Sequence, residues 1–104
     1  MKRAEIWWAR LPDPAGRRPV ILVSRDAAYA VRTSVTVVEV TATIRGIASE
    51  VGLGTRDGLP RRCVASADNV VTIPKRMLEA RIGALSSEKR AQLDAALRFS
   101  LGLD

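Results

Sequence analysis

Apolar and polar residues alternate along most of the first 85 residues, with the two-residue period that is typical of β-strands. The clearest stretch is residues 34–41, where β-branched side chains stand at most positions and favour a strand. Val35, Val37 and Glu39 point to one face of this strand, and Thr41 follows on the same face. Because valines stand on the other face too, we predict a strand that is buried on both sides.

Shorter segments with the same period predict further strands. These segments are residues 4–10, 18–23, 47–53, 63–66 and 70–74. Residues 11–16 contain two prolines and a glycine and predict a loop. Residues 25–30 predict a short helical turn with Asp26 near its N-cap, and residues 67–69 a polar corner between two strands. Residues 75–85 are ambiguous, because 76–80 suit a helical turn and 80–85 alternate like a closing strand.

The last segment of the chain changes to the period of an α-helix. Ser86 can cap its start, and Gly102 ends it. Asp94 and Arg98 stand four residues apart and predict an ion pair on its surface. One apolar stripe, which we expect to pack on the core, consists of Leu93, Ala96, Leu97 and Leu101.

These elements predict a single domain spanning residues 1–104, of the α+β class and mainly β. Five to seven short strands form a strongly curved antiparallel sheet, and the C-terminal helix closes it. This arrangement suits a small SH3-like barrel.

Composition narrows the function. The net charge of +6, from 17 basic and 11 acidic residues, favours polyanionic partners such as nucleic acid, an acidic protein segment or a membrane surface. Cys63 is the single cysteine, so no internal disulfide is possible, and a reducing compartment is expected. The chain has no histidine, which argues against common zinc sites, a Ser-His-Asp triad, a two-histidine ribonuclease mechanism and a catalytic role of Cys63. No segment is apolar for long enough to span a bilayer, and we expect a cytoplasmic protein without a metal.

The stretch Gly16–Asp26 carries the first candidate for chemistry. Gly16 permits unusual backbone angles, and Pro19 holds Arg18 in an extended conformation at the start of an apolar strand. A guanidinium fixed there suits a phosphate, because its planar fork of donors matches the phosphate oxygens. The alternative is a solvated arginine at a strand edge.

Two adjacent tryptophans lie in the first predicted strand, where they point to opposite faces. One sheet face cannot bury both. Trp7 or Trp8 is therefore a dimer contact or a platform for an unpaired base, unless one is a core residue and the other a half-exposed packing residue.

Several segments, in the order expected along the whole chain, resemble the MazF/PemK (Kid) toxins of bacterial toxin–antitoxin systems. The first match is Glu5–Trp8, similar to the opening strand of the family, and the second is Gly16–Val23, similar to its Gly-x-Arg-Pro-Val strand. The other matching segments are Val40–Thr43, Thr72–Leu78, Ile82–Ser86 and Ala95–Leu103. The loop at residues 11–16 is shorter than is usual in the family.

The resemblance implies a dimeric, cofactor-free and metal-independent endoribonuclease that cuts single-stranded RNA and leaves a 2′,3′-cyclic phosphate and a 5′-hydroxyl. It assigns catalysis to Arg18 and Thr41. The residues that we expect to bind RNA are Arg17, Trp8, Ser24, Thr43, Arg45, Asp68 and Asn69. No general base is evident, and Asp26 and Asp68 are candidates only. The expected protein partner is a cognate antitoxin with an acidic C-terminal tail.

Two alternatives share this fold. A CcdB-like poison of DNA gyrase would act through its C-terminal residues and without enzymatic activity. An inactive RNA-binding module would keep the basic groove. Detection of a cyclic phosphate product distinguishes the enzyme from both.

Overall fold

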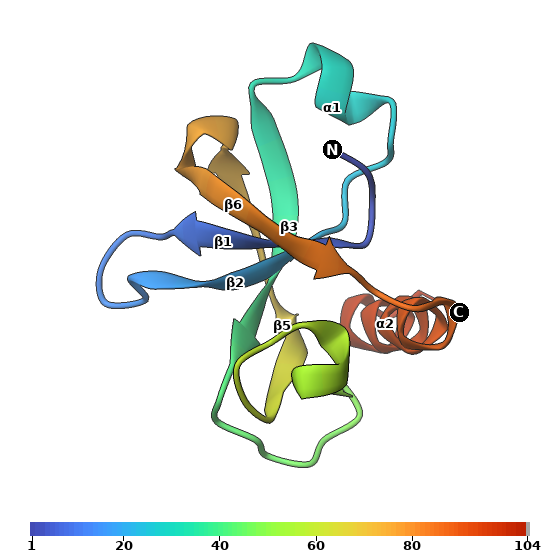
Figure 1. Cartoon of the computed structure of the whole chain (residues 1–104). Coiled ribbons are helices and arrows are strands. Elements are labelled where there is room, and N and C mark those ends of the chain that lie inside the picture. The colour runs from blue at the N-terminus through green and yellow to red at the C-terminus, as the bar shows by residue number, and fades with distance from the viewer. Residues whose placement is uncertain (104) are drawn as a thin grey trace.

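The long strand β3 (Ser34–Thr41) lies inside a six-stranded antiparallel sheet in the computed structural model, which describes residues 1–103 (Figure 1). The strand order is β4-β5-β3-β2-β1-β6, and all neighbouring pairs run antiparallel. The other elements are β1 (Glu5–Arg10), β2 (Arg17–Leu22), α1 (Ala28–Val31), β4 (Glu50–Leu53), η1 (Thr55–Asp57), β5 (Cys63–Pro74), η2 (Lys75–Met77), β6 (Leu78–Ala84) and α2 (Ser87–Leu101). The curled sheet with its C-terminal helix confirms the predicted fold class.

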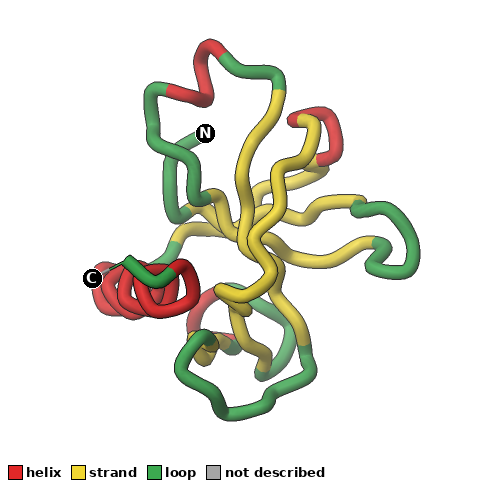
Figure 2. The backbone as a smooth tube through the Cα atoms, turned by 180° about the vertical axis from the view of Figure 1, so that it is seen from behind, coloured by secondary structure: helices red, strands yellow, loops and turns green. Residues whose placement is uncertain are grey.

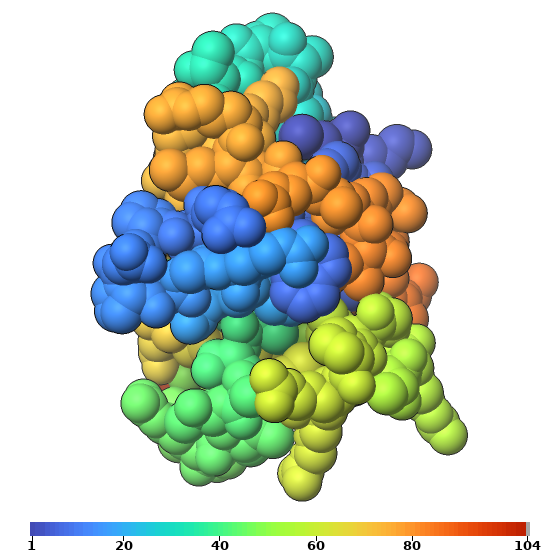
Figure 3. Space-filling model, turned by 60° about the vertical axis from the view of Figure 1, so that its left-hand side comes forward, coloured from blue at the N-terminus to red at the C-terminus, as the bar shows by residue number. Residues whose placement is uncertain are grey.

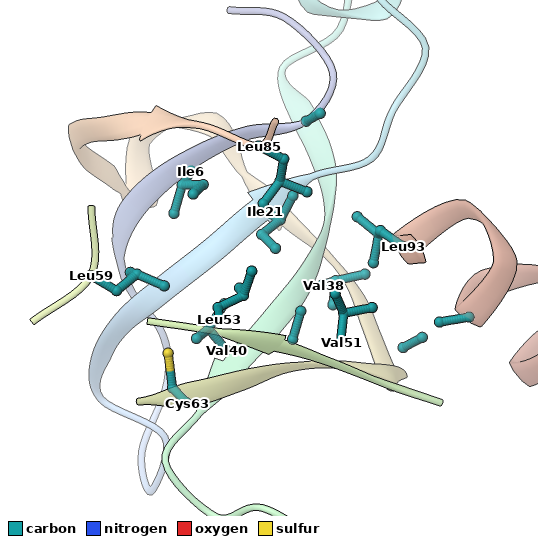
Figure 4. Packing of buried hydrophobic residues seen from close by; sticks show 14 residues of the cluster. Ile6, Ile21, Val38, Val40, Val51, Leu53, Leu59, Cys63, Leu85 and Leu93 are labelled. Carbon is teal, nitrogen blue, oxygen red and sulfur yellow. The ribbon is translucent and has the colours of Figure 1, made fainter. Parts of the chain in front are cut away.

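Both faces of β3 are buried, as its run of valines predicts. Val38 and Val40 belong to a cluster between the curled sheet and α2 (Figure 4). Other members of this cluster are Ile6, Ile21, Val51, Leu53, Cys63 and Leu93. Burial of each large aliphatic side chain stabilises the fold by about 1.5–3 kcal/mol.

The opposite face of β3 contributes Val35 and Val37 to a second cluster. Its other buried members are Ala9, Leu11, Val20, Leu22, Tyr29 and Ile73. Leu11 comes from the β1–β2 loop and Tyr29 from α1, so short connecting segments cover this face where α2 does not. The sheet is therefore sandwiched between two small cores.

Residues 63–74 form one continuous strand, which corrects the predicted polar corner at 67–69. Ser66 pairs with Glu39 and Val70 pairs with Val38, so the three residues between them form a bulge against β3. The ambiguous segment after β5 makes one 3₁₀ turn, η2, and then β6, whose pairing with β1 decides in favour of a strand.

Helix α2 begins and ends where its capping residues predict. The Oγ of Ser86 accepts a hydrogen bond from the backbone N–H of Lys89 at 3.2 Å. Gly102 adopts a left-handed conformation with φ +69°, which favours glycine at this position. The helix lies beside the sheet, close to β4 and β5 (Figure 2).

Two details of α2 differ from the prediction. Leu93 and Ala96 are buried, but Leu101 is 57% exposed. Asp94 pairs with the guanidinium of Arg3 at 2.9 Å, and the predicted pair with Arg98 does not form. Contact with the N-terminal segment therefore replaces a pair within the helix.

The short helix α1 also differs from its prediction. Its N-cap is Ala27, and no side chain caps it. The carboxylate of Asp26 instead accepts a hydrogen bond from the backbone N–H of Arg3 at 2.6 Å. Within residues 1–103, no helix is long and apolar enough to cross a membrane.

Candidate active site

The loop before β2 holds Arg18 in place. Its ends are joined by a hydrogen bond from the Leu11 N–H to the Gly16 carbonyl at 2.9 Å, and Gly16 has the predicted positive φ of +65°. The carbonyl of Ala15 then accepts hydrogen bonds from Nε and Nη2 of Arg18, both at 3.3 Å. A closed turn thus fixes one edge of the guanidinium.

Glu39 on β3 holds a third nitrogen of the same guanidinium. Its Oε1 lies 3.2 Å from Nη1 of Arg18, and the two side chains are 30% (Arg18) and 22% (Glu39) exposed. A guanidinium has five N–H groups, and these contacts use one on each nitrogen. One N–H on each terminal nitrogen therefore stays available to an incoming group, and two such donors suit two oxygens of a phosphate.

Thr41 lies at the end of β3 that is nearest to Arg18. The pairing of β2 with β3 ends at Val20 and Glu39, and Arg18 and Thr41 each lie two residues beyond that last pair, on β2 and β3 respectively. The alternation of side chains puts Arg18, Glu39 and Thr41 on one face. The Oγ1 of Thr41 accepts a hydrogen bond from the backbone N–H of Thr43 at 3.2 Å, so its own O–H can donate to a ligand.

Two loops border this end of the sheet. One is the β1–β2 loop at residues 11–16, and the other is the 42–49 segment between β3 and β4. In the space-filling view, the β1–β2 hairpin lies above the segment that follows β3, in blue and green respectively (Figure 3). Arg18 is the second residue after the first loop and Thr41 directly precedes the second, so the two predicted catalytic residues lie toward the same end of the sheet.

In the bulge of β5, the side chains of the neighbouring residues Asp68 and Asn69 contact different parts of the molecule. The amide of Asn69 donates to the Oγ of Ser66 at 3.3 Å, and Ser66 is the cross-strand partner of Glu39. Asp68 instead accepts hydrogen bonds from the hydroxyls of Ser49 at 2.5 Å and of Ser100 on α2 at 2.9 Å. These two bonds lower the pKa of the Asp68 carboxyl, with the Ser49 bond the stronger cause. Asn69 therefore adjoins the Arg18 face, and Asp68 turns toward α2.

Arg17 and Trp8 lie together on the opposite face of the β1–β2 hairpin. The guanidinium carbon of Arg17 stands 4.3 Å from the centroid of a Trp8 ring, in a cation–π contact. Glu79 accepts from Arg17 at 2.8 Å and from Arg10 at 3.1 Å, and these bonds lower the pKa of its carboxyl. The surface formed by Arg10, Arg17 and Trp8 therefore lies on the other side of the hairpin from Arg18. On this surface, the guanidinium of Arg17 covers one side of the Trp8 ring.

The remaining predicted RNA-binding residues are spread more widely. Ser24 lies beyond the far end of β2, roughly 20 Å along the chain from Arg18, and its Oγ accepts the backbone N–H of Thr36. Thr43 and Arg45 are exposed in the 42–49 segment next to Thr41. The structure thus brings Arg18, Thr41, Thr43 and Arg45 toward one end of the sheet, with Asn69 beside Ser66 nearer its middle, and Ser24 does not join them.

Cys63 is buried at the start of β5, and this burial raises the pKa of its thiol above the ordinary value. The described residues contain no group of three histidine, cysteine, aspartate or glutamate side chains that could hold a metal ion. The sequence reasoning missed Glu39 as a member of the site. The only hint in the sequence was that Glu39 lies on the same face of the strand as Thr41, and Glu39 belongs to no recognised motif.

The fold and the site define a class of small β-proteins, in which a curled sheet with a C-terminal helix presents an arginine and a threonine at neighbouring strand ends. The family model of the PemK-like, MazF-like toxins of type II toxin–antitoxin systems matches residues 2–101. The chain therefore belongs to this toxin family, as the sequence motifs predict.

Curated relatives and solved structures agree. The chain is 37% identical over 100 residues to the probable endoribonuclease MazF5 of Mycobacterium tuberculosis (strain ATCC 25618 / H37Rv). The aligned residues cover 95% of this chain and 91% of that protein. It superposes on the Mycobacterium tuberculosis toxin MazF-mt6 with a TM-score of 0.89 and 35% identity, covering 96% of this chain and 98% of the other. A mycobacterial endoribonuclease solved in complex with its cognate antitoxin superposes with a TM-score of 0.88 and 28% identity, over 100% of this chain and 97% of the other.

Proposed function

We propose that this protein is an endoribonuclease toxin that cleaves single-stranded RNA by attack of a 2′-hydroxyl on its own phosphodiester. The observation that carries the proposal is the Arg18 guanidinium, which two protein groups hold while one N–H on each terminal nitrogen faces no partner among the described residues. Relatives that are 37% identical are named endoribonucleases, and this supports the same activity here.

The reaction forms a bond between the 2′-oxygen and phosphorus and breaks the bond from phosphorus to the 5′-oxygen. The products are a 2′,3′-cyclic phosphate and a 5′-hydroxyl. Negative charge grows on the phosphoryl oxygens in the transition state, and Arg18 stabilises it with its two remaining donors. Thr41 donates its hydroxyl to the same phosphate and orients it for attack. A positioned arginine and a hydroxyl supply this stabilisation without a metal ion.

DNA lacks the attacking 2′-hydroxyl, so this route restricts the enzyme to RNA. The net charge of +6 favours a polyanionic substrate and also an acidic inhibitor. We therefore propose that a cognate antitoxin with an acidic C-terminal tail binds this protein and displaces RNA. A relative of the same fold carries the name of an endoribonuclease in complex with its cognate antitoxin. We also propose a homodimer with its active sites near the interface.

The test is incubation of the purified protein with a long RNA and with a DNA of matching sequence, in the presence of EDTA. We expect discrete cuts in the RNA alone, with 2′,3′-cyclic phosphate ends. Arg18→Ala abolishes the cuts, and Thr41→Ala reduces the rate strongly. Arg32→Ala is the matched control, because Arg32 is an exposed arginine beside α1, at the other end of β3 from Thr41.

No cutting by the wild-type protein would refute the proposal and favour a binding module or a gyrase poison. Cutting that EDTA abolishes would refute the metal-free route. Equal loss in Arg18→Ala and Arg32→Ala would show that total charge matters and the site does not.

A further inference from the structure

Cleavage by this route needs a group that takes the proton of the 2′-hydroxyl, and the chain has no histidine for that task. Arginine is a poor base because its guanidinium stays protonated at neutral pH. Of the carboxylates considered from the sequence, Asp26 lies beyond the end of β2 that is remote from Arg18, where it accepts from Arg3, and both oxygens of Asp68 accept from Ser49 and Ser100. Neither aspartate is therefore placed to take this proton from a phosphate-bound ribose at Arg18.

Glu39 meets the geometric requirements. It stands on the same face as Arg18 and Thr41, and only its Oε1 is engaged, by Arg18 at 3.2 Å. Its Oε2 accepts no hydrogen bond from any residue that the structure describes, and its side chain is 22% exposed, so solvent and substrate can reach it. The loops at residues 11–16 and 42–49 border the end of the sheet where Arg18 and Thr41 lie, and the Glu39 carboxylate lies next to Arg18 there.

We propose that Glu39 is the general base of the RNA cleavage, an assignment that rests on the proposed function. The Oε2 of Glu39 takes the proton as the 2′-O–H bond breaks, and the freed electron pair forms the bond from the 2′-oxygen to phosphorus. The bond from phosphorus to the 5′-oxygen then breaks, and the 5′-oxygen takes a proton from water. The hydroxide left by that water takes the proton from Glu39, which restores the carboxylate.

Arg18 couples the two parts of this step. One guanidinium N–H holds the Oε1 of Glu39, and the two remaining N–H groups hold the phosphate. The ribose whose 2′-hydroxyl attacks is directly attached to that phosphate. Binding the phosphate to Arg18 therefore brings the 2′-hydroxyl next to the carboxylate without any further positioning group.

The test compares single-turnover cleavage of a fluorescent RNA by wild type, Glu39→Gln and Glu39→Asp across pH. Glutamine keeps an oxygen that accepts from Arg18 but cannot take a proton. We expect Glu39→Gln to slow cleavage by about 10²–10⁴-fold and to abolish the acidic limb of the pH–rate profile, while its affinity for RNA stays close to wild type. Glu39→Asp keeps a carboxylate and is expected to retain the acidic limb at an intermediate rate.

Glu5→Gln is the matched control, because Glu5 forms an ion pair of the same 3.2 Å length with Arg81, at the opposite end of β1 from the residue that pairs with Arg18. Its rate and pH profile should equal those of the wild type. Glu39→Gln with a rate within tenfold of wild type and an unchanged pH profile would overturn the proposal, since Glu39 would then only hold Arg18. A faster Glu39→Gln would overturn it too, because Glu39 would then restrain Arg18.

If Glu39→Gln does not fold, Glu39→Asp decides the matter: loss of its acidic limb would also overturn the assignment. Failure of the proposed function is a separate outcome, namely no cleavage by the wild-type protein at any pH.

Discussion

The substitution Arg18→Lys separates the charge of Arg18 from its shape. Arginine makes three hydrogen bonds to the protein, two to Ala15 and one to Glu39, and keeps one N–H on each terminal nitrogen for a phosphate. These contacts add up to five donors. A lysine ammonium has three donors on one nitrogen, so at least two of the five contacts are lost in the complex with the transition state.

The expected effect follows from this difference. A hydrogen bond to a charged group is worth about 1.5–3 kcal/mol, so two lost bonds raise the barrier by about 3–6 kcal/mol. Each 1.36 kcal/mol is a factor of ten in rate, and the rate should therefore fall by about 10²–10⁴-fold. The folded protein should change little, because Arg18 is 30% exposed and its ion pair lies near the surface, where such pairs contribute about 0–1 kcal/mol.

The assay is single-turnover cleavage with enzyme in excess over a labelled RNA, so that product release does not limit the rate. Thermal unfolding checks that the variant is folded, and Arg32→Lys serves as the control. A rate for Arg18→Lys above about a tenth of the wild-type rate, one step of 1.36 kcal/mol, would refute the reasoning, since positive charge alone would then suffice.

Two further predictions concern stability. Leu93→Ala should lower the free energy of unfolding in urea by about 2–5 kcal/mol, because Leu93 is fully buried. Leu101→Ala, at an exposed position of the same stripe, should change the free energy of unfolding by less than about 0.5 kcal/mol, and equal losses in the two variants would contradict the packing of α2. Hydrogen bonds from Ser49 and Ser100 lower the pKa of the Asp68 carboxyl in the folded protein below its value in the unfolded chain. The charged carboxylate therefore stabilises the native state at pH values above the unfolded pKa, and this stabilisation disappears as the pH falls through the folded pKa. Asp68→Asn should therefore lose less stability than wild type on acidification below about pH 4, and parallel curves of stability against pH would disprove this.

The local features of this chain were predictable because they depend on neighbouring residues. The valine run of β3 predicted burial on both faces, and each face does belong to a core. Ser86 and Gly102 mark the ends of α2, and Gly16 adopts the positive φ that its loop requires. The order of family motifs predicted the toxin family, which the comparisons confirm.

The site was predictable only in part. Arg18 and Thr41 were assigned by motif, and the register of β2 and β3 brings them toward the same end of the sheet. The roles of these residues remain predictions until the variants are measured. Glu39 could not be assigned from the sequence, because its contact with Arg18 joins residues 21 positions apart.

By itself, the sequence determined the strand and helix periods, the capping residues, the basic charge and the family. The tertiary structure alone decided which side chains meet. The bulge in β5 turns Asp68 toward α2 and leaves Asn69 beside Ser66, and the N-terminal segment takes Asp94 away from Arg98. The physical reason is that period and capping depend on residues within one or two turns of the chain, whereas such contacts depend on strand order, register and packing, which the whole chain sets together.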